Sequence, residues 1–221
     1  MKSLQKLGGL AAIIEGASLL AMLVVFIAIL GPAGLTEPSD FNDPTKFFSA
    51  MQANSGAWLY LSFIRGVIIS PFFWLTIIAL HQRLKSYAQD GMRVATFFGV
   101  AGAIFYMFGH LVDVTWINSL ISSTDTARAA AELPIAHRLW QIGISGGGFF
   151  VGLWVLCLST IIIRSSLLPK WVGYVGIIAG LLSIPNLVTM VKPSLPIFGI
   201  FDILIGWALW NAKPLHTISN D

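Results

Sequence analysis

Six long apolar stretches separated by short polar segments dominate this sequence. An α-helix needs about 20 apolar residues to cross about 30 Å of hydrocarbon, and each stretch approaches or exceeds that length. The stretches cover residues 7–30, 58–80, 94–121, 139–163, 171–190 and 193–210. The pattern predicts an all-α integral membrane bundle of six transmembrane helices, which forms a single domain over residues 1–221.

The first stretch could be mistaken for a secretory signal, because two lysines precede it. It is longer than a usual signal core and it contains Glu15. We therefore expect it to be a retained first helix.

Lysine and arginine are distributed unequally between the two sets of connecting segments. Basic residues concentrate on the cytoplasmic side of membrane proteins. Eight lie in the termini and even-numbered loops: Lys2, Lys6, Arg83, Lys85, Arg93, Arg164, Lys170 and Lys213. Four lie in the opposite loops: Lys46, Arg128, Arg138 and Lys192. The distribution predicts that both termini are cytoplasmic.

The longest outer loop follows the first stretch and contains a helix signal. Asp43 before Pro44 is typical of an N-cap and first turn. Phe47, Phe48 and Met51 follow, so we expect a short interfacial helix whose apolar side chains enter the lipid surface. An alanine-rich segment in the next outer loop, which ends at a proline, predicts a second such helix.

The composition agrees with a membrane protein. Of the 221 residues, 56% are hydrophobic and 10% are charged, against about 25% charged in soluble domains. The net charge of +3 comes from scattered basic residues, so we expect no nucleic-acid partner. Cys157 is the single cysteine, which excludes an intramolecular disulfide.

Five ionisable side chains inside the apolar stretches are the candidate functional residues, because charge within a membrane is costly and normally faces a partner or a wet cavity. A rise of 1.5 Å per residue places four of them about 8–16 Å below the outer helix ends: Arg65, His110, Asp113 and Asp202. Glu15 lies about 12 Å from the inner end of its helix. We therefore expect Glu15 to be a second, isolated acid in a different environment.

Tyr106, His110 and Asp113 share one face of the third stretch by their spacing. Together with Arg65 and Asp202 they form a predicted polar cluster, for which two interpretations remain open. In one, the cluster is a ligand pocket in which Arg65 binds an anionic group and His110 exchanges protons. In the other, which we favour, Arg65 only neutralises Asp113 or Asp202 and holds the helices in register.

The sequence predicts neither a metal site nor a cofactor. The spacing of His110 and Asp113 suits two ligands on one helix, but the other histidines, His81, His137 and His216, lie at or beyond the predicted helix ends. The same placement disfavours a haem with two histidine ligands. No catalytic residue is assigned, because the sequence contains no recognisable arrangement of nucleophile, base and oxyanion site.

Small residues and prolines predict details of the packing. Glycines recur at close spacing in the fourth and fifth stretches, which lets neighbouring backbones approach. Pro71 and Pro185 lie inside predicted helices and should kink them.

The loop before the fifth stretch carries a resemblance to a known family. Residues 166–176 read SLLPKWVGYVG, and the first stretch opens with Leu7-Gly8-Gly9-Leu10 followed by Gly16. In these features the chain resembles a family of bacterial polytopic inner-membrane proteins that is described only as a domain of unknown function. The resemblance implies the membrane fold and a bacterial inner-membrane location, and it implies no activity.

From these observations we expect a multi-pass binding or accessory protein, and we favour a non-enzymatic role while leaving an enzyme open. Its predicted partners are the lipid bilayer and a small ligand, lipid headgroup or partner helix at the polar cluster, and the chain could also oligomerise. A small-molecule or proton-coupled transporter is the second hypothesis, and an intramembrane enzyme is the third.

Overall fold

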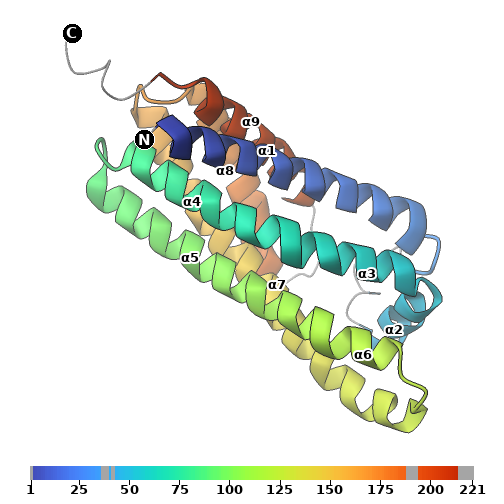
Figure 1. Ribbon diagram of the computed structural model, residues 1–221. Helices are drawn as coiled ribbons and strands as arrows, with labels where there is room; N and C mark the ends of the chain where they lie inside the picture. The colour runs from blue at the N-terminus through green and yellow to red at the C-terminus, as the bar shows by residue number, and fades with distance from the viewer. Residues whose placement is uncertain (1, 36–39, 41–42, 188–193, 214–221) are drawn as a thin grey trace.

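The computed structural model describes residues 2–35, 40, 43–187 and 194–213, and every regular element within them is helical. Four long helical rods run side by side, with two shorter helices and one outer helix packed against them (Figure 1). The first three rods are α1 (Lys2–Val25) with the π-turn η1 (Phe26–Leu30); α3 (Ser55–Phe63), η3 (Ile64–Ile69) and α4 (Ser70–Leu84); and α5 (Gln89–Leu111), η4 (Val112–Ile117) and α6 (Asn118–Ile121). The fourth rod is α7 (Thr126–Arg164); the remaining helices are α2 (Pro44–Ala53), α8 (Lys170–Ser183) with the 3₁₀ turn η5 (Ile184–Leu187), and α9 (Ser194–Asn211).

The four rods are long and apolar enough to cross a membrane. The candidate spans are Ser3–Leu30, Ser55–Leu84, Gln89–Ile121 and Ala127–Arg164. The predicted fifth and sixth stretches correspond to shorter apolar helices, Lys170–Ser183 and Pro196–Asn211. The all-α fold is therefore confirmed, and the four long apolar helices support a multi-pass membrane protein. Residues 188–193, where the last two predicted spans meet, lie outside the described residues.

The helix α7 corrects the prediction for the second outer loop. The alanine-rich segment is helical, but it continues without interruption into the fourth predicted span and carries Pro134 inside the helix. Asp125 caps the start by accepting a hydrogen bond from the Arg128 backbone N–H at 3.0 Å. Proline removes one hydrogen bond but does not end a membrane helix that neighbours support. Pro185 behaves differently, because α8 ends two residues before it.

The helices approach one another closely at glycines, as the sequence predicted for the fourth and fifth stretches, and the same holds for the first and last helices. A Cβ atom added to Gly9 would lie 2.8 Å from the Gly206 carbonyl oxygen, and one added to Gly16 would collide with the Gly199 carbonyl. The glycines of α1 and α9 therefore face each other in pairs one heptad apart. Gly109 of α5 and Gly143 of α7 meet in the same way. Contact of this kind replaces hydrophobic burial as the force that joins helices in lipid.

Two apolar cores fill the bundle, one toward each end. The first packs around Trp154 of α7 and Leu80 of α4, and the second around Trp58 of α3 and Trp140 of α7. Tyr106 of α5 contacts both cores from the region between them. Tyr106 therefore lies where the two cores meet.

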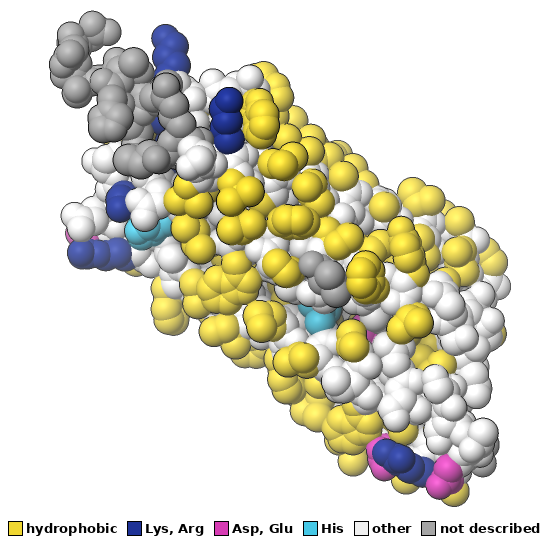
Figure 2. All heavy atoms as spheres, viewed as in Figure 1, with side chains coloured by type: hydrophobic (Ala, Val, Ile, Leu, Met, Phe, Trp, Pro, Cys, Tyr) yellow, Lys and Arg dark blue, Asp and Glu magenta, His cyan; other side chains and the backbone are white. Residues whose placement is uncertain are grey.

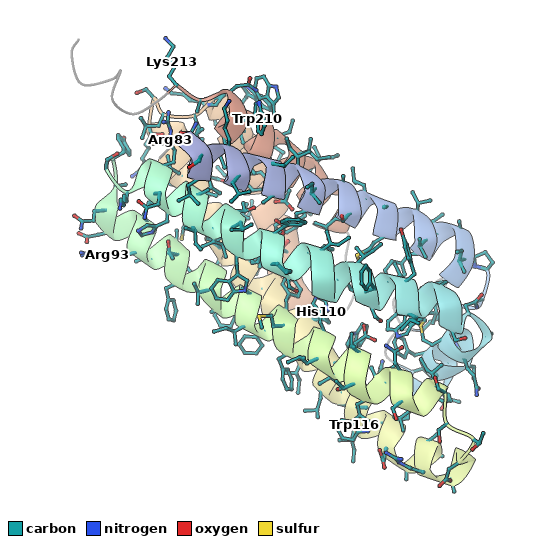
Figure 3. The ribbon with its side chains drawn as sticks, in the orientation of Figure 1. Arg83, Arg93, His110, Trp116, Trp210 and Lys213 are labelled. Atoms are coloured by element: carbon teal, nitrogen blue, oxygen red, sulfur yellow. The ribbon has the colours of Figure 1, made fainter. Side chains whose placement is uncertain are left out.

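Both described chain ends lie at one end of the bundle (Figure 1). The Gln5 amide near the start of α1 donates hydrogen bonds to the carbonyls of Leu209 and Ala212 at 2.8 and 2.9 Å. Arg83, Arg93 and Lys213 lie at this same end, away from Trp116 (Figure 3). Between the two ends, the visible surface is mostly hydrophobic (Figure 2), as a lipid-facing surface requires.

The outer helix α2 begins where the sequence predicted. Asp43 accepts hydrogen bonds from the backbone N–H groups of Thr45 at 2.9 Å and Lys46 at 3.2 Å, and Pro44 occupies the first turn. The predicted orientation is wrong for two side chains, however. Phe47 and Met51 are fully buried in the bundle rather than inserted into lipid, because Trp58 and α7 offer them an apolar surface.

Candidate functional site

A cavity of about 70 Å³ lies between the two apolar cores, near the middle of the bundle. Side chains from α1, η3, α4, α5, α7 and α9 line it. Its ionisable lining residues are Glu15, Arg65, Tyr106, His110 and Asp202. In Figure 2 a histidine side chain is visible at mid-length, at the place where Figure 3 labels His110.

Arg65 and Asp113 form a buried ion pair beside this cavity. The Arg65 Nη2 atom lies 3.0 Å from the Asp113 Oδ2 atom, and both side chains are buried. The hydroxyl of Ser62 donates to the same Asp113 oxygen at 2.9 Å. The Trp58 ring covers the guanidinium, with 4.5 Å between the Arg65 Cζ atom and the ring centroid. The prediction that Arg65 pairs with Asp113 or Asp202 is thus confirmed for Asp113.

Both members of this pair lie in π-helical turns, Arg65 in η3 and Asp113 in η4. A π-turn disturbs the regular hydrogen bonds of the helix, and such turns are frequent at functional sites. Here the Arg65 Nε atom donates to the Leu61 carbonyl at 3.1 Å, and the Ser70 hydroxyl donates to the Arg65 carbonyl at 3.0 Å. Side chains therefore satisfy backbone carbonyls around the turn. Pro71, predicted to kink its helix, is the second residue of α4 and lies two residues after the end of η3.

Glu15 and Asp202 also line the cavity, from the adjacent helices α1 and α9. They are 4% and 3% exposed, and their carboxyl groups interact electrostatically. Thr76 of α4 donates to Glu15 at 3.5 Å. The structure places Glu15 in the same cavity as the other candidates, which corrects the expectation of an isolated acid.

Tyr106 and His110 line the cavity from α5. Their rings stack with 6.0 Å between centroids and 5° between planes, as their spacing on one helix face predicted. Tyr106 is also close enough to Glu15 and Asp202 to interact with both electrostatically. All six predicted site residues therefore gather at one place, either lining the cavity or contacting its lining.

Sequence reasoning missed an aromatic cluster above this site. Phe47 of α2 lies 5.3 Å from Trp58, 4.8 Å from His137 and 5.1 Å from Trp140, measured between ring centroids. His137 is buried in α7 and not at a helix end as expected. The proline three residues earlier concealed this, because it suggested a loop. The cluster connects the outer helix to Arg65 through Trp58.

A metal centre is not favoured by the residues present. Among the described residues, no group of three or more His, Cys, Asp or Glu side chains is placed to hold a metal ion. His110 and Asp113, which have the spacing of two ligands, have separate roles at the cavity and the ion pair.

Comparison with known proteins identifies the family. The family model for a domain of unknown function, DUF4386, matches residues 14–211. The chain belongs to this family. No curated protein and no solved structure matches the chain. The DUF4386 match begins just before Glu15 and ends with α9, so all the residues of the cavity lie within the DUF4386 domain.

Proposed function

We propose that this DUF4386 protein is a six-helix bacterial inner-membrane protein with both termini in the cytoplasm, and that it binds a small ligand in the mid-bundle cavity. The basic residues of the termini and even-numbered loops support the orientation. The hydrophobic helices α8 and α9 would be the fifth and sixth crossings. Both are shorter than the four rods, and each packs along a longer rod, α8 along α7 and α9 along α1.

The observation that carries the binding proposal is the unequal pairing of the buried charges. Arg65 neutralises Asp113, and helix registration alone would explain that pair. Glu15 and Asp202 face the cavity, and no lysine or arginine among the described residues forms an ion pair with either. A purely structural role therefore leaves two costly carboxyl groups without a function. A ligand site gives them one.

Thiol labelling tests whether the cavity accepts a solute. Ser70 lines the cavity, so Ser70→Cys, in a Cys157→Ala background, should react with the small neutral reagent methyl methanethiosulfonate. The matched control is Ser159→Cys, because Ser159 is fully buried in the apolar core at the terminal end. We expect Ser70→Cys to react at least about tenfold faster than Ser159→Cys. Equal, slow reaction at both positions would contradict a ligand site.

Transport is the second candidate, and the position of the cavity favours it. An apolar core lies between the cavity and each end of the bundle, so loosening one core at a time would expose the site alternately. A membrane-impermeant trimethylammonium thiosulfonate applied to oriented vesicles separates the two functions. Transport requires that Ser70→Cys reacts from both sides, whereas binding alone requires only one.

A further inference from the structure

We propose that the ligand of the mid-bundle cavity is a small organic cation, namely a protonated amine held by Glu15 and Asp202. This inference rests on the proposed binding function and specifies its ligand class. It reverses the sequence-based hypothesis in which Arg65 binds an anionic group.

The charge at the cavity is the first argument. Among the described residues, Arg65 is the single lysine or arginine that lines the cavity. Asp113 already forms an ion pair with it at 3.0 Å. An anion would have to compete with Asp113 for Arg65 while two further carboxyl groups repelled it. A cation meets Glu15 and Asp202 directly. The electrostatics therefore select positive charge.

The surroundings of Asp202 are the second argument. Asp202 is only 3% exposed, and its side chain lines the cavity. Within the described residues it accepts no hydrogen bond, in contrast to Glu15, which has Thr76 as a donor. A buried carboxylate normally has hydrogen-bond donors. A ligand ammonium group would supply them.

The remaining walls distinguish an organic ammonium ion from a metal cation. Phe73, Tyr106, Trp154 and Phe198 line the same cavity. Aromatic faces attract ammonium groups, and rings around such groups are a known recognition mode. Hard metal cations need about six oxygen ligands, which two carboxyl groups and aromatic walls do not provide. A primary ammonium has three donors to share between Glu15, Asp202 and a neighbouring oxygen.

The size of the cavity limits the ligand. A water molecule needs about 10–15 Å³ of comparable space, so 70 Å³ corresponds to roughly five water-sized volumes. Methylammonium and ethylammonium are suitable in size, and either could be the head of a longer amphiphile.

Charged labelling reagents test the selection. The rate of Ser70→Cys modification is measured with cationic 2-aminoethyl and anionic 2-sulfonatoethyl methanethiosulfonate, each divided by its rate at the exposed position Ser49→Cys. We expect the normalised cationic rate to exceed the anionic rate by about tenfold or more, because a carboxyl pair without a protein cation favours a positively charged reagent. Asp202→Asn and Glu15→Gln should each reduce the ratio. The control Glu132→Gln, which alters a partly exposed carboxylate paired with Arg128 outside the cavity, should leave it unchanged.

Competition between a free amine and the labelling reagent tests the same ligand class, and Ser70→Cys is the only cavity substitution that it needs. Methylammonium chloride should slow labelling of Ser70→Cys by the neutral reagent in a saturable manner, and sodium acetate at equal ionic strength should not. Protection by acetate, or a normalised ratio near one that Asp202→Asn does not change, would overturn the cationic ligand. Either result would leave the binding proposal standing if the neutral reagent still reaches Ser70→Cys and not Ser159→Cys.

Discussion

At the scale of single residues, the Arg65–Asp113 pair is the interaction whose loss should cost most. Arg65→Leu leaves Asp113 buried without its cation, and breaking a buried pair from one side costs about 3–5 kcal/mol. The double variant Arg65→Leu/Asp113→Leu strands no charge, so it should recover at least half of this loss. Unfolding of the purified protein in a graded mixture of mild and denaturing detergent measures both.

The exposed pair Arg128–Glu132 is the matched control. Its atoms are 2.8 Å apart, but the side chains are 54% and 33% exposed. Water screens such pairs, which contribute about 0–1 kcal/mol. Arg128→Leu should therefore change stability little. Simple additivity of the Arg65 and Asp113 substitutions would refute the energetic coupling inferred from the geometry.

Helix depth predicted from the sequence identified this pair but misplaced Glu15. Counting residues gives the height of a side chain along a helix, and that height placed Arg65 and Asp113 together. The isolation of Glu15 was inferred because its depth, about 12 Å, was counted from the inner end of its helix, whereas the other depths were counted from the outer ends. In the structure its helix is long enough for Glu15 to reach mid-height, where α9 brings Asp202 beside it. Height alone does not reveal which helices are neighbours.

At the scale of elements, the glycine contacts between α1 and α9 should control their packing. A side chain at Gly16 would collide with the Gly199 carbonyl and lie 2.9 Å from Ile203. Backbone atoms cannot move aside as a flexible side chain can, so Gly16→Leu should destabilise the protein by about 1–3 kcal/mol or more. Detergent unfolding measures the change.

Gly56 supplies the comparison for this prediction. It lies in α3, and a Cβ atom there would meet nothing within 4 Å. Alanine is a better helix former than glycine by about 0.5–1 kcal/mol, so Gly56→Ala should be neutral or stabilising. If Gly16→Leu were equally well tolerated, the close approach of α1 and α9 would not be the contact that stabilises them.

The cap of α2 gives a second prediction at this scale. Asp43→Ala removes the acceptor of the Thr45 and Lys46 amides and should cost about 1 kcal/mol of local helix stability. Hydrogen exchange over Pro44–Ala53 should become about fivefold faster. Asp90→Ala, a change at an exposed aspartate near the other end of the bundle, should not affect this exchange. Unchanged exchange in Asp43→Ala would contradict the capping role.

Element boundaries show what the hydrophobic pattern can and cannot predict. The cap of α2 has a local chemical signature, so its start was predictable from Asp43 and Pro44. The continuity of α7 through Pro134 was not, because tertiary support decides whether a proline ends a helix. The burial of Phe47 likewise depends on Trp58 and Trp140, which are distant in sequence.

At the scale of the whole molecule, helix length determines how the bundle can sit in a bilayer. The 39 residues of α7 extend about 58 Å, whereas the 18 residues of α9 extend about 27 Å. A hydrocarbon core of about 30 Å matches the shorter helix, so α7 must project into the aqueous phase. Its start at Thr126, beside α6 and far from the chain ends, is the projecting part. The long apolar helices were predictable from hydropathy, but this difference in length was not.

The last prediction concerns the orientation of this bundle. Ser49 on α2 and Ser86 in the turn between α4 and α5 are both exposed. The turn between α4 and α5 lies at the end of the bundle where the chain ends lie, and α2 lies at the opposite end (Figure 1). Because the positive charges of short loops remain cytoplasmic, a membrane-impermeant maleimide added to intact spheroplasts should label Ser49→Cys and spare Ser86→Cys, each in the Cys157→Ala background. Inverted vesicles should give the opposite pattern, and permeabilised cells should label both, which shows that each thiol is reactive. Labelling of Ser86→Cys alone in spheroplasts would reverse the orientation of the whole bundle, and with it the side from which Ser70→Cys is expected to be reached.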